Sequence, residues 1–115
     1  MRVKIGCDLV DVKNFKKSLD RGGRRFLARC FTPQELASSR RTETLAGIFA
    51  AKEAILKALE LGPGAWLNIE IQKEPNGRPT ARVLGFSKKI LDRDLSISHD
   101  GAYSMAVAAF LLEKE

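Results

Sequence analysis

The sequence is short of cysteine and histidine and has no long apolar run, and each shortage removes a class of protein. Its two cysteines, Cys7 and Cys30, form no CxxC pair and no zinc-ligand spacing, so we expect reduced thiols. The longest apolar run, residues 105–112, is too short to cross a bilayer, and the first ten residues lack the apolar core of a signal peptide. These absences predict a soluble, cytoplasmic protein with no membrane partner.

Several common catalytic motifs are also missing. The glycine-rich stretch "LGPGAW" lacks the Lys-Ser/Thr pair of a phosphate-binding P-loop. The single histidine, His99, has no carboxylate partner that the sequence identifies, and neither cysteine lies in a nucleophile motif. P-loop chemistry and a Ser/Cys–His nucleophile are therefore excluded.

What the chain does contain is a globular composition with an uneven charge. Its 115 residues, 44% hydrophobic and 30% charged, predict one domain over residues 1–115, small enough for neighbouring subunits to supply part of the core. Within the net charge of +6, residues 13–29 hold seven basic side chains and one acid. Composition alone leaves two interpretations of this stretch open, an anionic partner or a solvated basic face.

Residues 2–12 are expected to form a half-buried strand, because apolar and polar side chains alternate. We expect the apolar face to lie in the core and Asp8 to point away from it. The apolar set is Val3, Ile5, Cys7 and Leu9.

Helices follow in the first half. One is expected over residues 12–20, where the pair Gly22-Gly23 breaks it. The next begins with Thr32 as N-cap, Pro33 in the first turn and Glu35 closing a capping box.

A long helix is predicted over residues 43–60, ended by Gly62-Pro63-Gly64. Between residues 49 and 59 only Lys52, Glu53 and Lys57 are charged. Such a helix is too apolar for the surface of a monomer, so we expect it to be enclosed, partly by neighbouring copies of the chain.

The second half reads as strands around one short helix. Residues 68–73 and 80–84 flank an Asn-Gly hairpin signal, and residues 86–91 are expected to be helical. Asp100-Gly101 is the expected turn before residues 103–112, which are apolar on both faces like a central strand. The prediction is an α+β fold whose mainly antiparallel sheet packs against the long helix.

Asp8, Glu53 and Lys57 form the most suggestive chemical set. Two carboxylates from separate elements suit Mg²⁺, which takes one or two protein carboxylates and completes its octahedron with waters and substrate phosphates. Lys57 and Lys52 would then hold phosphate oxygens as point charges. The alternative is structural, because a Glu→Lys pair four residues apart is a routine helix stabiliser.

His99 in "SISHD" has two interpretations as well. It is either a polar edge residue beside a hairpin or a phosphate-binding donor, with the serine hydroxyls facing the same ligand. The spacing does not decide between them.

Five segments, in this order along the chain, resemble the short 4'-phosphopantetheinyl transferases. They are "IGCDLVDVKNF", "RCFTPQEL", "LAGIFAAKEAILKAL", "NGRP" and "LSISHDGAYSMAVAA". The resemblance implies the fold of that family and transfer of the phosphopantetheine arm of coenzyme A to a serine of an apo acyl carrier protein, releasing adenosine 3',5'-bisphosphate. The carrier, from fatty-acid, polyketide or other synthesis, is not specified.

The same resemblance implies roles for individual residues. Asp8 and Glu53 match the Mg²⁺ ligands, and Glu53 or a metal-bound water accepts the serine proton. Lys57 matches the lysine near the phosphates, and members of this type form homotrimers with coenzyme A between protomers. The residues expected at coenzyme A are Lys52, Lys57, Asn76, Gly77, Arg78, Pro79, Ser98 and His99.

The basic stretch gains a partner from the resemblance, because acyl carrier proteins are acidic. Its expected docking residues are Lys13, Lys16, Lys17, Arg21, Arg24 and Arg25. Nucleic-acid binding is the competing class, but the stretch lacks interleaved surface aromatics and a reader motif. A non-catalytic trimeric scaffold would explain the enclosed helix but not the set of Asp8, Glu53, Lys57 and His99.

Overall fold

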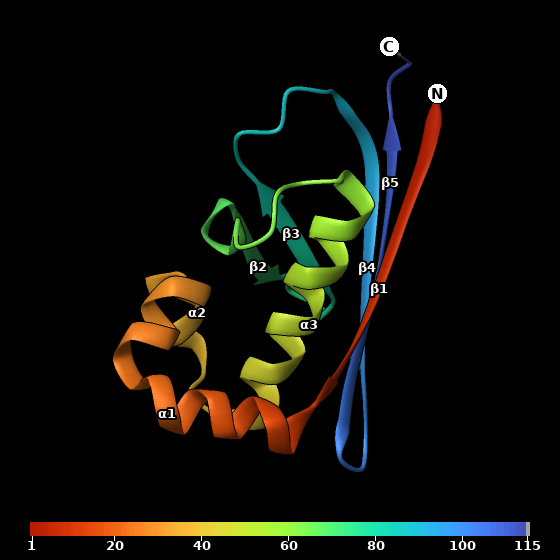
Figure 1. Ribbon diagram of the computed structural model, residues 1–115. Helices are drawn as coiled ribbons and strands as arrows, with labels where there is room; N and C mark the ends of the chain where they lie inside the picture. The colour runs from red at the N-terminus through yellow and green to blue at the C-terminus, as the bar shows by residue number, and fades with distance from the viewer. Residues whose placement is uncertain (115) are drawn as a thin grey trace.

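A three-stranded antiparallel sheet forms one layer of the computed structural model, which describes residues 1–114 (Figure 1). Its strand order is β1 (Arg2–Asp11), β5 (Tyr103–Leu112) and β4 (Ile90–Asp100). β5 is central, as its apolar sequence on both faces predicts. The first strand in the chain therefore pairs with the last along its whole length, from Arg2 opposite Leu112 to Asp11 opposite Tyr103.

Helix α3 (Thr42–Leu59) lies across one face of this sheet (Figure 1), close to its predicted bounds. The helix ends at Glu60, which itself adopts the left-handed conformation (φ 55°), so the following glycine segment is not the cap. Ala50, Ala54 and Ile55 are fully buried within this one chain. The helix is thus enclosed largely by its own sheet and neighbouring elements, so its burial does not require other copies of the chain.

The contact between β1 and α3 depends on Gly6. A Cβ atom at this position would lie 2.0 Å from the carbonyl oxygen of Ala54 and 2.8 Å from the amide nitrogen of Ala58. Only a residue without a side chain lets the strand backbone approach the helix backbone so closely. Gly6 therefore sets which face of β1 meets the helix.

The opposite face of the sheet is open, which corrects the expectation for β1. Val3, Ile5 and Leu9 are 71%, 69% and 63% exposed. Figure 1 shows the helices and the second sheet on the other side. Alternation predicted the strand, but it does not say which face is covered, and Gly6 decides that.

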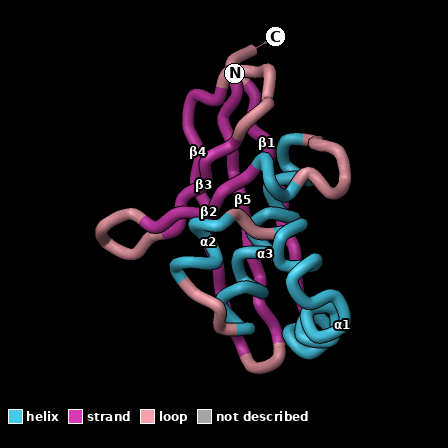
Figure 2. The backbone as a smooth tube through the Cα atoms, turned by 90° about the vertical axis from the view of Figure 1, so that its left-hand side faces the viewer, coloured by secondary structure: helices cyan, strands magenta, loops and turns pink. Residues whose placement is uncertain are grey.

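Helices α1 (Val12–Cys30) and α2 (Pro33–Ser38) pack around the first half of α3 (Figure 2). The predicted break in α1 lies at Gly23, whose φ of 52° and ψ of −134° interrupt a helix that then continues to Cys30. α2 has the predicted capping box, since Thr32 accepts from the Glu35 amide while Glu35 accepts from the Thr32 amide.

No helix within residues 1–114 combines the length and apolar character that a membrane crossing requires.

A second, two-stranded sheet completes the fold. After the single turn η1 (Trp66–Asn68), strands β2 (Ile69–Lys73) and β3 (Pro79–Val83) pair antiparallel, which confirms the predicted hairpin. The helix predicted over residues 86–91 is absent, because residue 90 already begins β4. The turn between β4 and β5 is Gly101-Ala102, one residue later than predicted, since Asp100 is paired with Tyr103.

Candidate active site

Asp8, Glu53 and Lys57 come together where β1 crosses α3. The Lys57 Nζ atom lies 3.1 Å from Asp8 Oδ1 and donates a 3.0 Å hydrogen bond to the carbonyl oxygen of Cys7. Within the described part of the chain, the ion pair of Lys57 is with Asp8 and not with Glu53 in the preceding turn. The simple helix-pair interpretation therefore does not describe Lys57.

The Glu53 carboxyl is partly buried and lies near a second carboxylate, that of Asp8. Burial raises its pKa above the ordinary glutamate value, and the nearby negative charge of Asp8 raises it further. Trp66 and Lys57 oppose that shift. Two carboxylates held close enough to repel, next to one ammonium group, form a site that favours additional positive charge.

This donor set fits Mg²⁺. No group of three or more His, Cys, Asp or Glu side chains in residues 1–114 is arranged to hold a metal through protein ligands alone. Mg²⁺ does not need such a cage, because one or two carboxylates with substrate phosphates and water satisfy it. With a formal charge of −1, the three side chains would repel a pyrophosphate unless a cation joined them.

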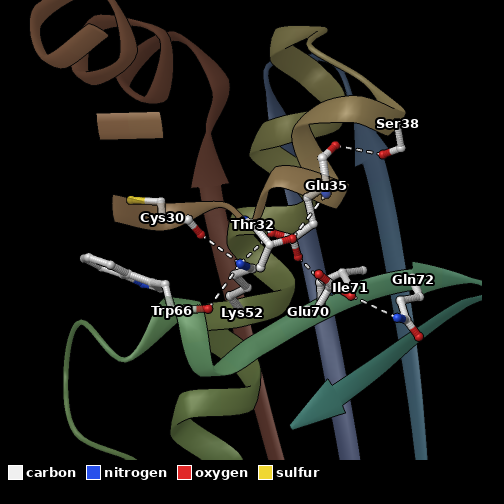
Figure 3. A network of polar contacts seen from close by, with 9 residues as sticks. All are labelled: Cys30, Thr32, Glu35, Ser38, Lys52, Trp66, Glu70, Ile71 and Gln72. Atoms are coloured by element: carbon white, nitrogen blue, oxygen red, sulfur yellow. Dashed lines mark hydrogen bonds and ion pairs between the residues drawn. The ribbon is translucent and has the colours of Figure 1, made fainter. Parts of the chain in front are cut away.

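Lys52 does not join this site. Its side chain is fully buried and forms a 2.7 Å ion pair with the equally buried Glu35 (Figure 3). Its ammonium group also donates to the carbonyl oxygens of Cys30 at 2.8 Å and Trp66 at 3.1 Å. All three N–H groups are used and none reaches solvent, so the structure does not support Lys52 as a coenzyme A ligand.

The Glu35–Lys52 pair instead joins five elements, since Cys30 is the last residue of α1. Glu35 on α2 also accepts a 2.7 Å hydrogen bond from the Ile71 amide on β2, while Lys52 on α3 reaches η1 through Trp66. The Lys52 ammonium group lies 5.6 Å from the centre of the Phe31 ring. Burial lowers the pKa of Lys52, and Glu35 opposes this shift. Fully hydrogen-bonded, such a pair fixes the elements that surround α3.

A cavity of about 630 Å³ lies beside the first half of α3. His99 lines it, together with Gly77 and Pro79 of the predicted "NGRP" segment. Asn76 accepts from the backbone amide of Arg78, and the Arg78 side chain pairs with Asp94 on β4. Gly77 and Pro79 are therefore the residues of this segment that the structure brings to the same cavity as His99.

Ser98 and His99 face opposite sides of the sheet. His99 is paired with Ser104 and lies on the helix side, whereas Ser98 is paired with Met105 on the open face. The expectation that the serine hydroxyls and His99 face one ligand within a protomer is wrong. Sequence reasoning could have excluded it, since adjacent residues of a strand point to opposite faces.

The predicted basic patch is exposed. Its six members from Lys13 to Arg25 lie on α1, on both sides of the kink at Gly23. Lys16 is paired with Asp20 at 2.9 Å. The remaining charges face solvent from both halves of the helix, which leaves them available to an anionic surface.

Comparison with known proteins decides the family. A model of the 4'-phosphopantetheinyl transferase superfamily matches residues 4–108. The chain belongs to this superfamily. It is 39% identical to the holo-[acyl-carrier-protein] synthase of Sulfurovum sp. (strain NBC37-1), over 96% of this chain and 98% of that one. It is 40% identical to the synthase of Moorella thermoacetica, over 92% and 91%.

Solved structures of the superfamily share the fold. The holo-[acyl-carrier-protein] synthase of Helicobacter pylori, in complex with coenzyme A, matches with a TM-score of 0.85 and 33% identity, covering 93% of this chain and 99% of that one. The enzyme from Neisseria meningitidis matches with a TM-score of 0.82 and 28% identity, covering 96% and 98%. The resemblance and the α+β fold predicted from the sequence are confirmed.

Proposed function

We propose that this phosphopantetheinyl transferase is a holo-[acyl-carrier-protein] synthase. It moves 4'-phosphopantetheine from coenzyme A to a serine of an apo acyl carrier protein and releases adenosine 3',5'-bisphosphate. The observation that carries the proposal is the convergence of Asp8, Glu53 and Lys57 at the β1–α3 crossing, in a chain whose relatives are synthases of this name. The H. pylori relative is known in complex with coenzyme A.

In this proposal Asp8 and Glu53 hold Mg²⁺, which, when bound, neutralises charge on the pyrophosphate of coenzyme A. Lys57 has one N–H group beyond the two it gives to Asp8 and Cys7, and that group is available to a phosphate oxygen. The serine oxygen forms a bond to phosphorus as the bond to the departing bisphosphate breaks. The serine proton must leave at the same stage, and the Glu53 carboxylate is one acceptor at the site.

The cavity beside α3 is the proposed place for the adenosine end of coenzyme A. No carboxylate lines it, while His99 and Lys73 bring groups that suit an anion. Gly77 and Pro79 bring backbone to its wall. His99 would then meet the 3'-phosphate.

The basic patch on α1 is the proposed docking surface for the carrier protein. Acidic partners are steered by exposed cations of this kind.

Both cysteines in the described chain are free, in keeping with a proposed cytoplasmic enzyme.

We also propose a homotrimer, supported by the open face of the sheet and not by α3. The open face of the sheet combines Val3, Ile5 and Leu9 of β1 with Tyr103 and Met105 of β5, all exposed. An apolar surface of this kind needs cover in water. Light scattering should give the mass of three chains; a monomeric mass with full activity would exclude the assembly.

The reaction is tested by incubating the protein with coenzyme A, Mg²⁺ and a panel of apo carrier proteins and measuring intact carrier mass. A gain of one phosphopantetheine group on the carrier is expected, and it should disappear when the modified serine is replaced by alanine. No gain with any carrier would contradict the proposal. A duplex or single-stranded nucleic acid bound with a steep salt dependence would favour the competing class.

A further inference from the structure

Ser104 is a polar residue in an otherwise apolar row. The side chains that β5 directs toward α3 are those of Ser104, Ala106, Ala108, Phe110 and Leu112, and all five are buried. A buried hydroxyl is costly unless it is hydrogen-bonded. Ser104 Oγ lies 2.8 Å from Nδ1 of His99, directly opposite on β4. The one polar group in this row is therefore committed to the imidazole.

Gly47 fixes the other edge of the ring. A Cβ atom at this position of α3 would lie 2.9 Å from Cε1 and 3.3 Å from Nε2 of His99. The ring thus fits against a place where the helix has no side chain. Gly47 and His99 both line the 630 Å³ cavity. Nδ1 is held by Ser104, and the Cε1–Nε2 edge lies against Gly47, which lines the cavity together with His99.

The hydroxyl chemistry determines what the ring offers to a ligand. A serine hydroxyl both donates and accepts, so it can donate to Nδ1 of a neutral imidazole, accept from Nδ1–H of the other neutral tautomer, or accept from an imidazolium. Nε2 carries a hydrogen in the first and third of these arrangements. Phosphate oxygens accept hydrogen bonds, so a ring held in this way suits a phosphate in the cavity.

We propose that Ser104 is a positioning residue that holds the imidazole of His99 with its Nε2–H toward the cavity, where it meets the 3'-phosphate of coenzyme A. The inference rests on the proposed function, because it takes coenzyme A as the ligand of this cavity. Ser104 itself touches no substrate; it acts through His99.

The kinetic test compares coenzyme A with 3'-dephospho-coenzyme A. Ser104→Ala should raise KM for coenzyme A about three- to tenfold, the effect of losing one hydrogen bond, and leave kcat nearly unchanged. KM for 3'-dephospho-coenzyme A should not change, because that donor lacks the phosphate. The control is Ser87→Ala, at an exposed serine in the loop before β4, which should alter neither KM.

Nuclear magnetic resonance gives a readout that a purely structural role would not move. His99 is the only histidine, so ring ¹⁵N signals need no assignment. In the wild type, adding coenzyme A should shift the Nε2 signal, whereas adding 3'-dephospho-coenzyme A should not. Nε2 should be protonated in the complex with coenzyme A. In Ser104→Ala the ring nitrogens should show exchange between tautomers. Ring signals identical to the wild type, with an unchanged preference for coenzyme A, would overturn the inference.

A third variant separates the role of Ser104 from the proposed coenzyme A site. His99→Ala should abolish the preference for coenzyme A over its dephospho form, which Ser104→Ala should only weaken. If His99→Ala leaves the preference intact, the 3'-phosphate lies elsewhere and the proposed coenzyme A site fails. If His99→Ala removes the preference and Ser104→Ala does not, the site stands and only the role of Ser104 is wrong.

Discussion

Two lysines on α3, five residues apart, have opposite environments. Lys52 is fully buried, paired with Glu35, and uses all three N–H groups inside the protein. The Lys57 side chain is 59% exposed and is paired with Asp8. It uses two of its three N–H groups inside the protein. The first ion pair is closed to ligands and the second is open to them. An ammonium group is useful to a substrate only if it keeps exposure and donor capacity, and the residue type alone does not reveal either.

The sharpest test of this contrast is the pair Lys52→Met and Lys57→Met. Removing Lys52 leaves Glu35 buried without its partner, which should lower the free energy of unfolding by about 3–5 kcal/mol. Removing the exposed Lys57 should cost less than about 1 kcal/mol. Urea unfolding of both variants measures this. Equal losses of stability would mean that the two environments differ less than their burial indicates.

The opposite order is expected for catalysis at the open site. Glu53→Gln and Asp8→Ala should lower kcat on the order of 100- to 1000-fold, the scale seen when one group that stabilises a transition state is removed. Glu53→Gln keeps the size and helix propensity of the side chain, so its unfolding should stay close to wild type. Wild-type rates for Glu53→Gln at ordinary Mg²⁺ would exclude Glu53 from the site.

The open face of the sheet extends the comparison to assembly. Ile5→Asp puts a charge in the centre of the exposed apolar surface and should convert the expected trimer to a monomer, because a charge buried there has no partner. Activity should fall with it if the site needs a neighbouring copy. The matched control is Lys13→Asp, an exposed change on α1, which should leave the mass by light scattering unchanged.

Charge reversal on α1 should have a smaller and more selective effect. Arg24→Glu should raise KM for the carrier protein several-fold and leave KM for coenzyme A nearly unchanged, since exposed charges mainly steer an acidic partner. The effect should shrink as salt approaches the screening regime, where the Debye length is about 10 Å at 0.1 M. Equal changes in both constants would assign the patch to the coenzyme A site.

The smallest effect concerns the pH dependence of stability without metal. The raised pKa of Glu53 means that the folded state binds this proton more tightly than the unfolded chain does. The stability from this group is present below the ordinary glutamate pKa and is lost as the pH rises through the raised value. Wild type should therefore lose stability relative to Glu53→Gln as the pH rises above the ordinary glutamate pKa, by less than about 1 kcal/mol because the carboxyl is partly exposed.

The sequence predicted the features that local chemistry controls. The capping box at Thr32, the extent of α3 and the central position of β5 all follow from patterns within a few residues. The short helix over residues 86–91 was wrong, because strand pairing with β5 overrides local helix preference there.

Features that depend on packing were not predictable in the same way. Alternation in β1 is equally satisfied by either face, and only the close approach of Gly6 to α3 turns Asp8 toward Glu53. The burial of Lys52 depends on Glu35, 17 positions earlier, reaching across from α2. Ser104 gave no signal, since one serine in an apolar strand identifies no partner until β4 places His99 opposite it.

The pairing of β1 with β5 also has a consequence for the order of folding. Residues 2–11 find their hydrogen-bonding partners only in residues 103–112, so this ladder closes a loop of most of the chain. Contacts so distant in sequence form late and slow the search. Glu53 and Lys57 can acquire helical structure early, but Asp8 is held beside them only after that ladder closes. During synthesis, the set of Asp8, Glu53 and Lys57 would therefore be incomplete until β5 has left the ribosome, which makes the proposed activity a property of the finished fold and of no earlier intermediate.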